Sequence, residues 1–143
     1  MTDNWNRKDQ HIHYAEMQYK PQSTNGLEQV RFVHQSFSEM KTTDVNLNTN
    51  LGSLSLDYPF FINAMTGGSD KAHVINKNLS IIAKETGLAM AVGSVSAAIK
   101  DPSLSESFKI VRKENPNGLI ISNLGAHHSL ENAKMAVDML EAD

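Results

Sequence analysis

The chain has 143 residues, which suits one ordinary domain, and 40% of them are hydrophobic, which is enough for a buried core. At a net charge of −3 the protein has no overall positive field to hold nucleic acid or an anionic membrane, so any anion site must be local. The absence of cysteine excludes disulfides, thiolate catalysis and cysteine-ligated zinc or iron–sulfur sites.

The N-terminus carries the charged residues Asp3, Arg7, Lys8 and Asp9 and lacks the apolar stretch of a signal peptide. No window approaches the roughly 18 consecutive apolar residues that a membrane span needs. We therefore expect a cytoplasmic protein that binds neither nucleic acid nor a membrane.

Residues 3–20 are predicted to form a short helix that ends before Pro21, because a proline disfavours helical geometry in the residue before it. Helical spacing places Arg7, Lys8 and His11 on one face. A guanidinium fork and an ammonium group together suit a phosphate or diphosphate. A solvated helix face is the alternative interpretation. The thin apolar stripe of this helix consists of Trp5, Ile12, Ala15 and Tyr19.

Residues 21–50 are polar and predict connecting structure, with one short strand at Val30–Val33. Leu51–Leu56 alternates apolar and small polar residues, which is the period of a half-exposed strand. This pattern is consistent with a short hairpin before the main sheet.

Pro59–Gly68 is the central stretch of the sequence. Its continuous apolar run predicts a strand buried on both faces, and Thr66-Gly67-Gly68 ends that strand before a helix that begins near Asp70 and stops at Gly87. Glycine at a strand-to-helix turn allows a ligand to approach the backbone closely. The turn is therefore a candidate site for a flat or anionic cofactor, with a purely geometric role for the glycines as the alternative.

Two further strand–helix units follow. Leu88–Val92 and Leu119–Ile121 are predicted as short buried strands. A capping box of Ser103 and Glu106 predicts the start of the helix between them, and a last helix is predicted to open near Ser129. The buried stripe of the middle helix is predicted to hold Leu104, Phe108 and Val111.

This order of elements predicts an α/β fold with three βα units. A flavodoxin-like sheet would need about five strands and a (β/α)₈ barrel eight, and an open three-stranded parallel sheet leaves its edges unpaired. We therefore expect the chain to be an incomplete domain, the front part of a larger fold, with an N-terminal extension at residues 1–57 and three βα units at residues 58–143.

Small neutral polar residues follow each predicted strand. Ligands of α/β folds bind at the carboxyl ends of the strands, where Thr66, Ser94 and Asn123 offer hydroxyl and amide groups. Together with the apolar Ala64 and Met65 they suit a neutral planar heterocycle such as a flavin, although ordinary loop residues are an alternative for each of them. No carboxylate stands there to build a metal cage or an acid–base pair. His127 and His128 are interpreted as loop or helix-start residues.

Four motifs in this order resemble one family. They are residues 7–12 (RKDQHI), 61–68 (FINAMTGG), 91–94 (AVGS) and 121–125 (ISNLG). Over nearly its whole length the chain resembles the type 2 isopentenyl diphosphate isomerases, which are flavoenzymes on a (β/α)₈ TIM barrel. The resemblance implies interconversion of isopentenyl and dimethylallyl diphosphate with FMN, NADPH as one reductant, and Mg²⁺. It also implies a homo-oligomer in which the reduced flavin is itself the acid–base group.

By this resemblance, Arg7, Lys8 and His11 bind the diphosphate, and Ser94 and Ser96 lie at the substrate. Flavin contacts are implied for Ala64, Met65, Thr66, Ser94 and Asn123. The Gln-Glu pair that meets the substrate and Mg²⁺ lies beyond Asp143 in the family, so the chain is expected to hold no catalytic or metal residue and to be inactive alone. Another FMN-dependent barrel oxidoreductase and a non-catalytic, self-associating fragment are the alternatives.

Overall fold

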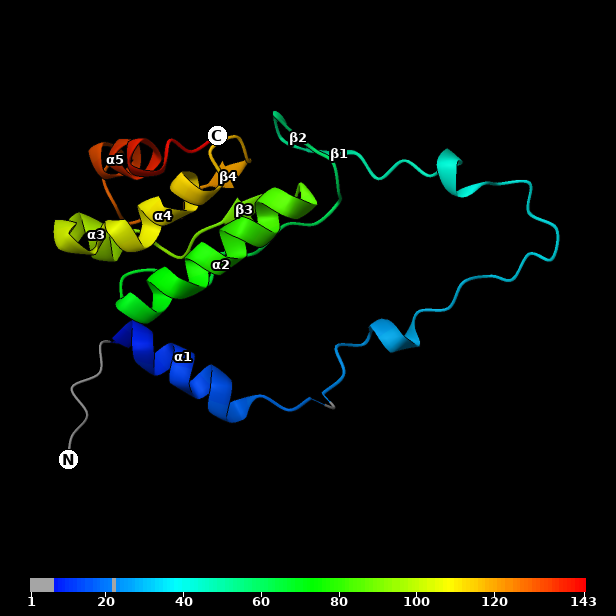
Figure 1. The fold of residues 1–143 in the computed structure, drawn as a ribbon, viewed down its shortest axis with the longest axis horizontal. Helices are drawn as coiled ribbons and strands as arrows, with labels where there is room; N and C mark the ends of the chain where they lie inside the picture. Colours follow the sequence, from blue (N-terminus) through cyan, green and yellow to red (C-terminus); the bar gives the residue numbers. More distant parts are fainter. Residues whose placement is uncertain (1–6, 22) are drawn as a thin grey trace.

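The computed structural model describes residues 7–21 and 23–143, and it shows mixed helical and strand structure with few strands (Figure 1). The first residues of the predicted N-terminal helix, 3–6, lie outside the described residues. The α-helices are α1 (Arg7–Gln18), α2 (Asp70–Thr86), α3 (Ser96–Lys100), α4 (Glu106–Glu114) and α5 (Leu130–Leu140). The strands are β1 (Thr49–Leu51), β2 (Leu54–Leu56), β3 (Met90–Ala91) and β4 (Ile120–Ile121), and the 3₁₀ turns are η1 (Leu27–Gln29), η2 (Thr42–Asp44) and η3 (Pro102–Leu104).

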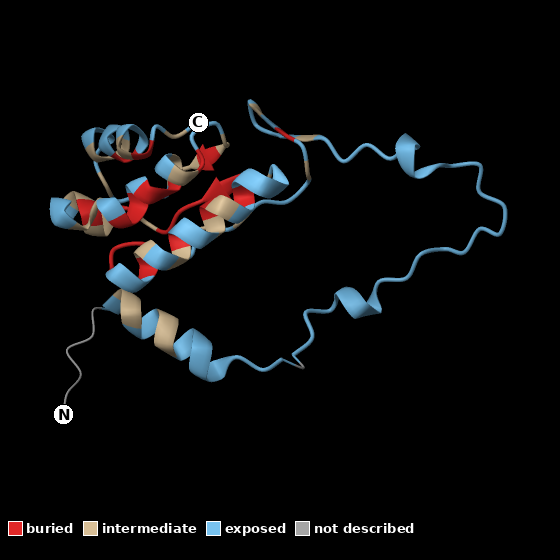
Figure 2. Cartoon of the chain, in the orientation of Figure 1, coloured by how far each residue is buried: buried red, intermediate tan, exposed pale blue. Residues whose placement is uncertain are grey.

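The core lies where α2 and α4 pack beside β3 and β4, as the red segments of Figure 2 show. Phe108 and Val111 of α4 are fully buried, which confirms the predicted apolar stripe at those two positions. Burial of side chains of this size stabilises a fold by about 1.5–3 kcal/mol each. Fully buried side chains from the other elements include Met90, Val92, Ile120 and Leu140.

The sheet beside this core is parallel but short. β3 pairs with β4 in the register Met90 to Ile120 and Ala91 to Ile121. The predicted strand at 59–68 is reduced to one parallel bridge between Ile62 and Met90, although the neighbouring Phe60 and Phe61 are apolar. Both phenylalanines are exposed, so among the described residues this run has structure on one side only.

Helix α2 confirms the predicted helix from Asp70, and it ends at Gly87 in the left-handed conformation. Helix α4 begins later than predicted, because Ser105 and not Ser103 precedes its first residue. The Ser103 hydroxyl donates to Asp101 at 2.6 Å instead of forming the capping box with Glu106. The five-residue helix α3 was not predicted, since so short a segment shows no apolar period.

The region before α2 lies mostly away from the core. The chain between α1 and β1 runs outward and returns as an extended segment with the two short turns η1 and η2 (Figure 1). The strand predicted at Val30–Val33 does not form, and Phe32 and Val33 are each 97% exposed, with no neighbouring strand to pair with among the described residues. The predicted hairpin is confirmed by β1 and β2, which are antiparallel. Among the described helices, none has both the length and the apolar character that crossing a membrane requires.

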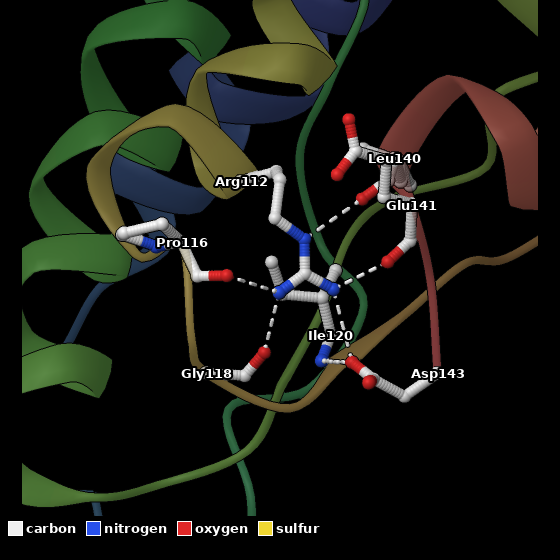
Figure 3. Close-up of polar contacts among 7 residues, drawn as sticks. All are labelled: Arg112, Pro116, Gly118, Ile120, Leu140, Glu141 and Asp143. Carbon is white, nitrogen blue, oxygen red and sulfur yellow. Dashed lines mark hydrogen bonds and ion pairs between the residues drawn. The ribbon is translucent and has the colours of Figure 1, made fainter.

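One arginine joins the end of α4 to β4 and to the end of α5 (Figure 3). The Arg112 guanidinium donates to the carbonyls of Pro116, Gly118, Leu140 and Glu141 and contacts the Asp143 carboxylate at 3.0 Å. The Ile120 N–H donates to the same carboxylate and lowers the pKa of Asp143; burial opposes this shift and Arg112 adds to it. This cluster fixes the end of α5 against the start of β4.

Candidate functional site

The ends of the three parallel segments lie at one edge of the sheet. The Gly93 N–H donates to the Thr66 carbonyl at 2.8 Å, and the Val95 N–H donates to the Asn123 carbonyl at 2.9 Å. These two bonds continue the ladder of Ile62, β3 and β4 beyond the last paired residues. The structure therefore brings the backbones of the predicted Thr66, Ser94 and Asn123 positions together, as expected for parallel strands.

The side chains at this edge differ in what they can offer a ligand. The Thr66 hydroxyl donates to the Asn76 side chain of α2, so it is directed toward the helix and not toward a ligand. Asn123 is exposed, and none of the hydrogen bonds found among the described residues involves its amide. Met65 is 72% exposed and Ala64 is half-buried, which leaves an apolar surface beside the amide.

Hydrogen bonds with Asn76 and Ser107 fix the turn at Thr66–Gly68, which we call the glycine turn. Asn76 is 1% exposed, and its amide donates to the Thr66 carbonyl at 3.3 Å and to the Ser107 carbonyl at 2.8 Å. The Ser107 hydroxyl accepts from the Gly68 N–H at 2.9 Å. Gly67 has φ +154°, and a Cβ there would overlap the Phe108 ring, so only glycine fits at this point. The turn is thus fixed by buried polar groups and close packing.

Four of the five predicted substrate residues, Arg7, Lys8, Ser94 and Ser96, line a cavity of about 450 Å³ beside the strand ends. Arg7 and Lys8 of α1 face Ser94 and Ser96 across it, and Lys100 at the end of α3 adds a third cation. Among residues 7–21 and 23–143, no Asp or Glu lines the cavity. We call this the cationic cavity; its remaining lining residues are Ala97, His127 and His128. Three cations with hydroxyl donors make a local site suited to an anion in a protein of negative net charge.

The predicted substrate residue His11 lies elsewhere. It lines a separate, smaller space of about 90 Å³ between α1 and the glycine turn, together with Ile12, Met65 and Thr66. Lys8 borders both spaces, and its side chain lies near Gly68. The structure therefore does not group His11 with Arg7 in the cationic cavity, and it places His11 next to the predicted flavin segment.

A chain of hydrogen bonds runs from the cationic cavity to α5. The hydroxyls of Ser94 and Ser96 are 2.8 Å apart, and Ser96 Oγ is 2.8 Å from His128 Nε2. His128 Nδ1 is in turn 3.1 Å from the amide nitrogen of Asn132, and the His127 and His128 rings lie 4.4 Å apart between centroids. His128 therefore has a defined place in the site, beyond the loop or helix-start role predicted for it.

The groups at the strand ends fit a neutral ring system in part. The Asn123 amide and the Ser94 hydroxyl can match the donor and acceptor edge of a heterocycle, and Met65 and Ala64 can cover one of its faces. The Thr66 hydroxyl adds no donor to that set, because its O–H already donates to Asn76. A metal site has less support: within residues 7–21 and 23–143, no three His, Cys, Asp or Glu side chains are grouped to hold an ion.

Curated relatives match almost the whole chain, whereas no family model matches it. A protein of Geobacillus sp. (strain WCH70) is 47% identical over 138 residues, which cover 96% of this chain and 39% of the relative. A protein of Streptomyces sp. (strain CL190) is 43% identical over 138 residues, covering 96% and 38%, and one of Staphylococcus epidermidis (strain ATCC 12228) is 45% identical over 136 residues, covering 95% and 39%. Each of these relatives is named isopentenyl-diphosphate delta-isomerase. The chain spans about two fifths of the length of these relatives.

Lys100, Asn76, His128 and Asn132 belong to the site but were not predicted from the sequence. Lys100 was missed because it lies at the end of α3, a helix of five residues that shows no apolar period in the sequence. Asn76 could have been suspected, because an amide at a buried position of an apolar helix stripe needs polar partners. No pattern in the sequence distinguishes His128 from His127, since only the fold places one of them against Ser96.

Proposed function

We propose that the protein carrying this chain interconverts isopentenyl and dimethylallyl diphosphate. The names of relatives that match 95–96% of the chain support this assignment. The observation that carries it is the cationic cavity, where Arg7, Lys8 and Lys100 surround the hydroxyls of Ser94 and Ser96. A diphosphate is the part of both substrates that such a set of cations and hydroxyl donors would recognise.

The chain's own residues would bind and orient the substrate. Arg7 offers a planar fork to phosphate oxygens, while Lys8 and Lys100 offer point charges on flexible stems. A diphosphate held there fixes one end of the substrate, and Met65 offers apolar surface to the other end beside the strand ends. Holding the reacting carbons in one orientation lowers the entropic part of the barrier to a proton shift.

We further propose that FMN, kept reduced by NADPH, is the cofactor and supplies the acid–base chemistry of the 1,3 proton shift. Ala64, Met65, Ser94 and Asn123 would hold its ring system. Thr66 would support this site indirectly, because its hydroxyl donates to the Asn76 side chain and so fixes the turn beneath the cofactor. Mg²⁺ is proposed as a further cofactor, and the described part of the chain has no group of three His, Cys, Asp or Glu side chains that could hold it.

We also propose that the chain forms part of a (β/α)₈ barrel in a homo-oligomeric enzyme and is inactive by itself. The parallel pairing of Ile62, β3 and β4 and the helices that separate them agree with such a barrel. The length of the relatives supports the proposal that the chain is only part of the enzyme, since it spans 38–39% of them.

A chimaera tests the proposal. This chain would be joined to the part of the Geobacillus relative that it does not match, and the product tested for a flavin spectrum and for isomerisation of isopentenyl diphosphate. We expect both, with no turnover by the 143-residue chain alone. A folded chimaera that binds flavin but does not isomerise the substrate would exclude the proposed reaction, and net oxidation of a hydroxy acid would favour the oxidoreductase alternative.

A further inference from the structure

A chain of hydrogen bonds links Asn132 through His128 and Ser96 to Ser94. Which group donates at each step is determined first at Asn132, in α5. The Asn132 amide nitrogen can only donate, so His128 Nδ1 at 3.1 Å must accept. A neutral imidazole that accepts at one nitrogen carries its proton on the other. His128 Nε2 therefore donates to Ser96 Oγ, 2.8 Å away.

The same direction continues to the cationic cavity. Ser96 Oγ accepts the hydrogen bond from His128, and its own O–H can donate to Ser94 Oγ, 2.8 Å away. The Ser96 backbone N–H also points at Ser94 Oγ, at 3.4 Å. In the arrangement where the Ser96 O–H donates, Ser94 Oγ accepts from both the hydroxyl and the N–H of Ser96, and its own O–H is left to donate.

We propose that Asn132 and His128 are positioning residues that make Ser94 a hydrogen-bond donor toward a phosphate oxygen in the cationic cavity. This inference rests on the proposed function, because it takes the anion in the cavity to be a diphosphate. Phosphate oxygens only accept hydrogen bonds, so a serine that could only accept would repel them. Arg7, Lys8 and Lys100 supply charge, and the hydrogen-bond chain supplies a donor of fixed direction.

Asn132→Asp reverses that direction with almost no change in size. A carboxylate only accepts, so it draws the proton of neutral His128 to Nδ1 and turns Nε2 into an acceptor. Ser96 then donates to His128, Ser94 donates to Ser96, and Ser94 presents a lone pair to the anion. The added negative charge also weakens anion binding. To separate the two effects, the same change is made in a variant whose hydrogen-bond chain is already broken.

Ser96→Ala provides this background. Binding of inorganic diphosphate to the purified protein would be measured by calorimetry at alkaline pH, with and without each change. We expect Asn132→Asp to weaken binding at least about tenfold more when Ser96 is present than in the Ser96→Ala background, since a hydrogen bond to a charged group is worth about that factor. Asn78→Asp, the same change on the exposed face of α2, is the matched control and should leave binding unchanged.

Nitrogen NMR of the His128 ring provides a readout that needs no ligand. We expect the Nε2–H tautomer in the unaltered protein and the Nδ1–H tautomer in Asn132→Asp. An Nδ1–H tautomer in the unaltered protein, or an equal loss of binding in both backgrounds, would overturn the inference. If the unaltered protein does not bind diphosphate at all, the proposed function fails while the tautomer still decides whether the chain of bonds has this direction.

Discussion

Replacing Asn76 by Ala should destabilise the protein by about 2–3 kcal/mol. The change removes three hydrogen bonds, to the Thr66 hydroxyl, the Thr66 carbonyl and the Ser107 carbonyl. Each is worth about 1 kcal/mol net, and the Thr66 carbonyl keeps its bond from Gly93. Alanine recovers about 0.6 kcal/mol through its higher helix propensity, which leaves a clear net loss.

Urea unfolding followed by circular dichroism measures this loss, provided the slope of free energy against denaturant is unchanged. Asn78→Ala is the matched control, because it lies on the same helix, is exposed and gains the same helix propensity. It should be neutral or slightly stabilising. If both variants unfold at the same urea concentration, the buried amide contributes nothing and the account of the glycine turn is wrong.

Three further predictions concern the cationic cavity and the C-terminal cluster. Lys8→Ala should raise the dissociation constant for inorganic diphosphate about tenfold or more in a calorimetric titration, while the exposed Lys134→Ala should leave it unchanged. Arg112→Met should cost about 2–4 kcal/mol in urea unfolding, because it leaves several carbonyls without their donor; an effect as small as that of Lys113→Ala would refute the structural role. Asp143 has a lowered pKa, so its stabilisation is present above the ordinary value of 3.8 and is lost as the pH falls through the lower folded-state value. Stability measured against pH should therefore show a fall of less than about 1 kcal/mol that Asp143→Asn lacks, since the carboxylate is 45% exposed.

The elements with a strong local signal were predicted well. Helix α2 was predicted from its apolar period and its terminal glycine, and both signals are local to the segment. The strand at Val30–Val33 failed for the opposite reason, since a strand needs a partner and the described structure offers none there. The start of helix α4 was ambiguous because serines repeat there, and Ser105 and not Ser103 precedes its first residue.

The site was predicted in position but not in detail. Strand order alone brings Thr66, Ser94 and Asn123 to one edge, because parallel strands end together. The inward direction of the Thr66 hydroxyl depends on Asn76, ten residues away on a packed helix. The contact of Ser96 with His128 spans 32 residues, so only the assembled fold determines it. The cofactor roles of these residues stay predictions.

The loose attachment of α1 has a thermodynamic consequence for ligand binding. The described residues of this helix include none that is buried, and a long extended segment tethers it to the remainder of the protein (Figure 1). Yet Arg7 and Lys8 reach the wall formed by Ser94 and Ser96. An anion that bridges the two sides strengthens the docking of the helix by the same factor by which the docked helix strengthens the anion's binding. The unreactive phosphate end of a substrate would thereby hold the N-terminal helix over the strand ends.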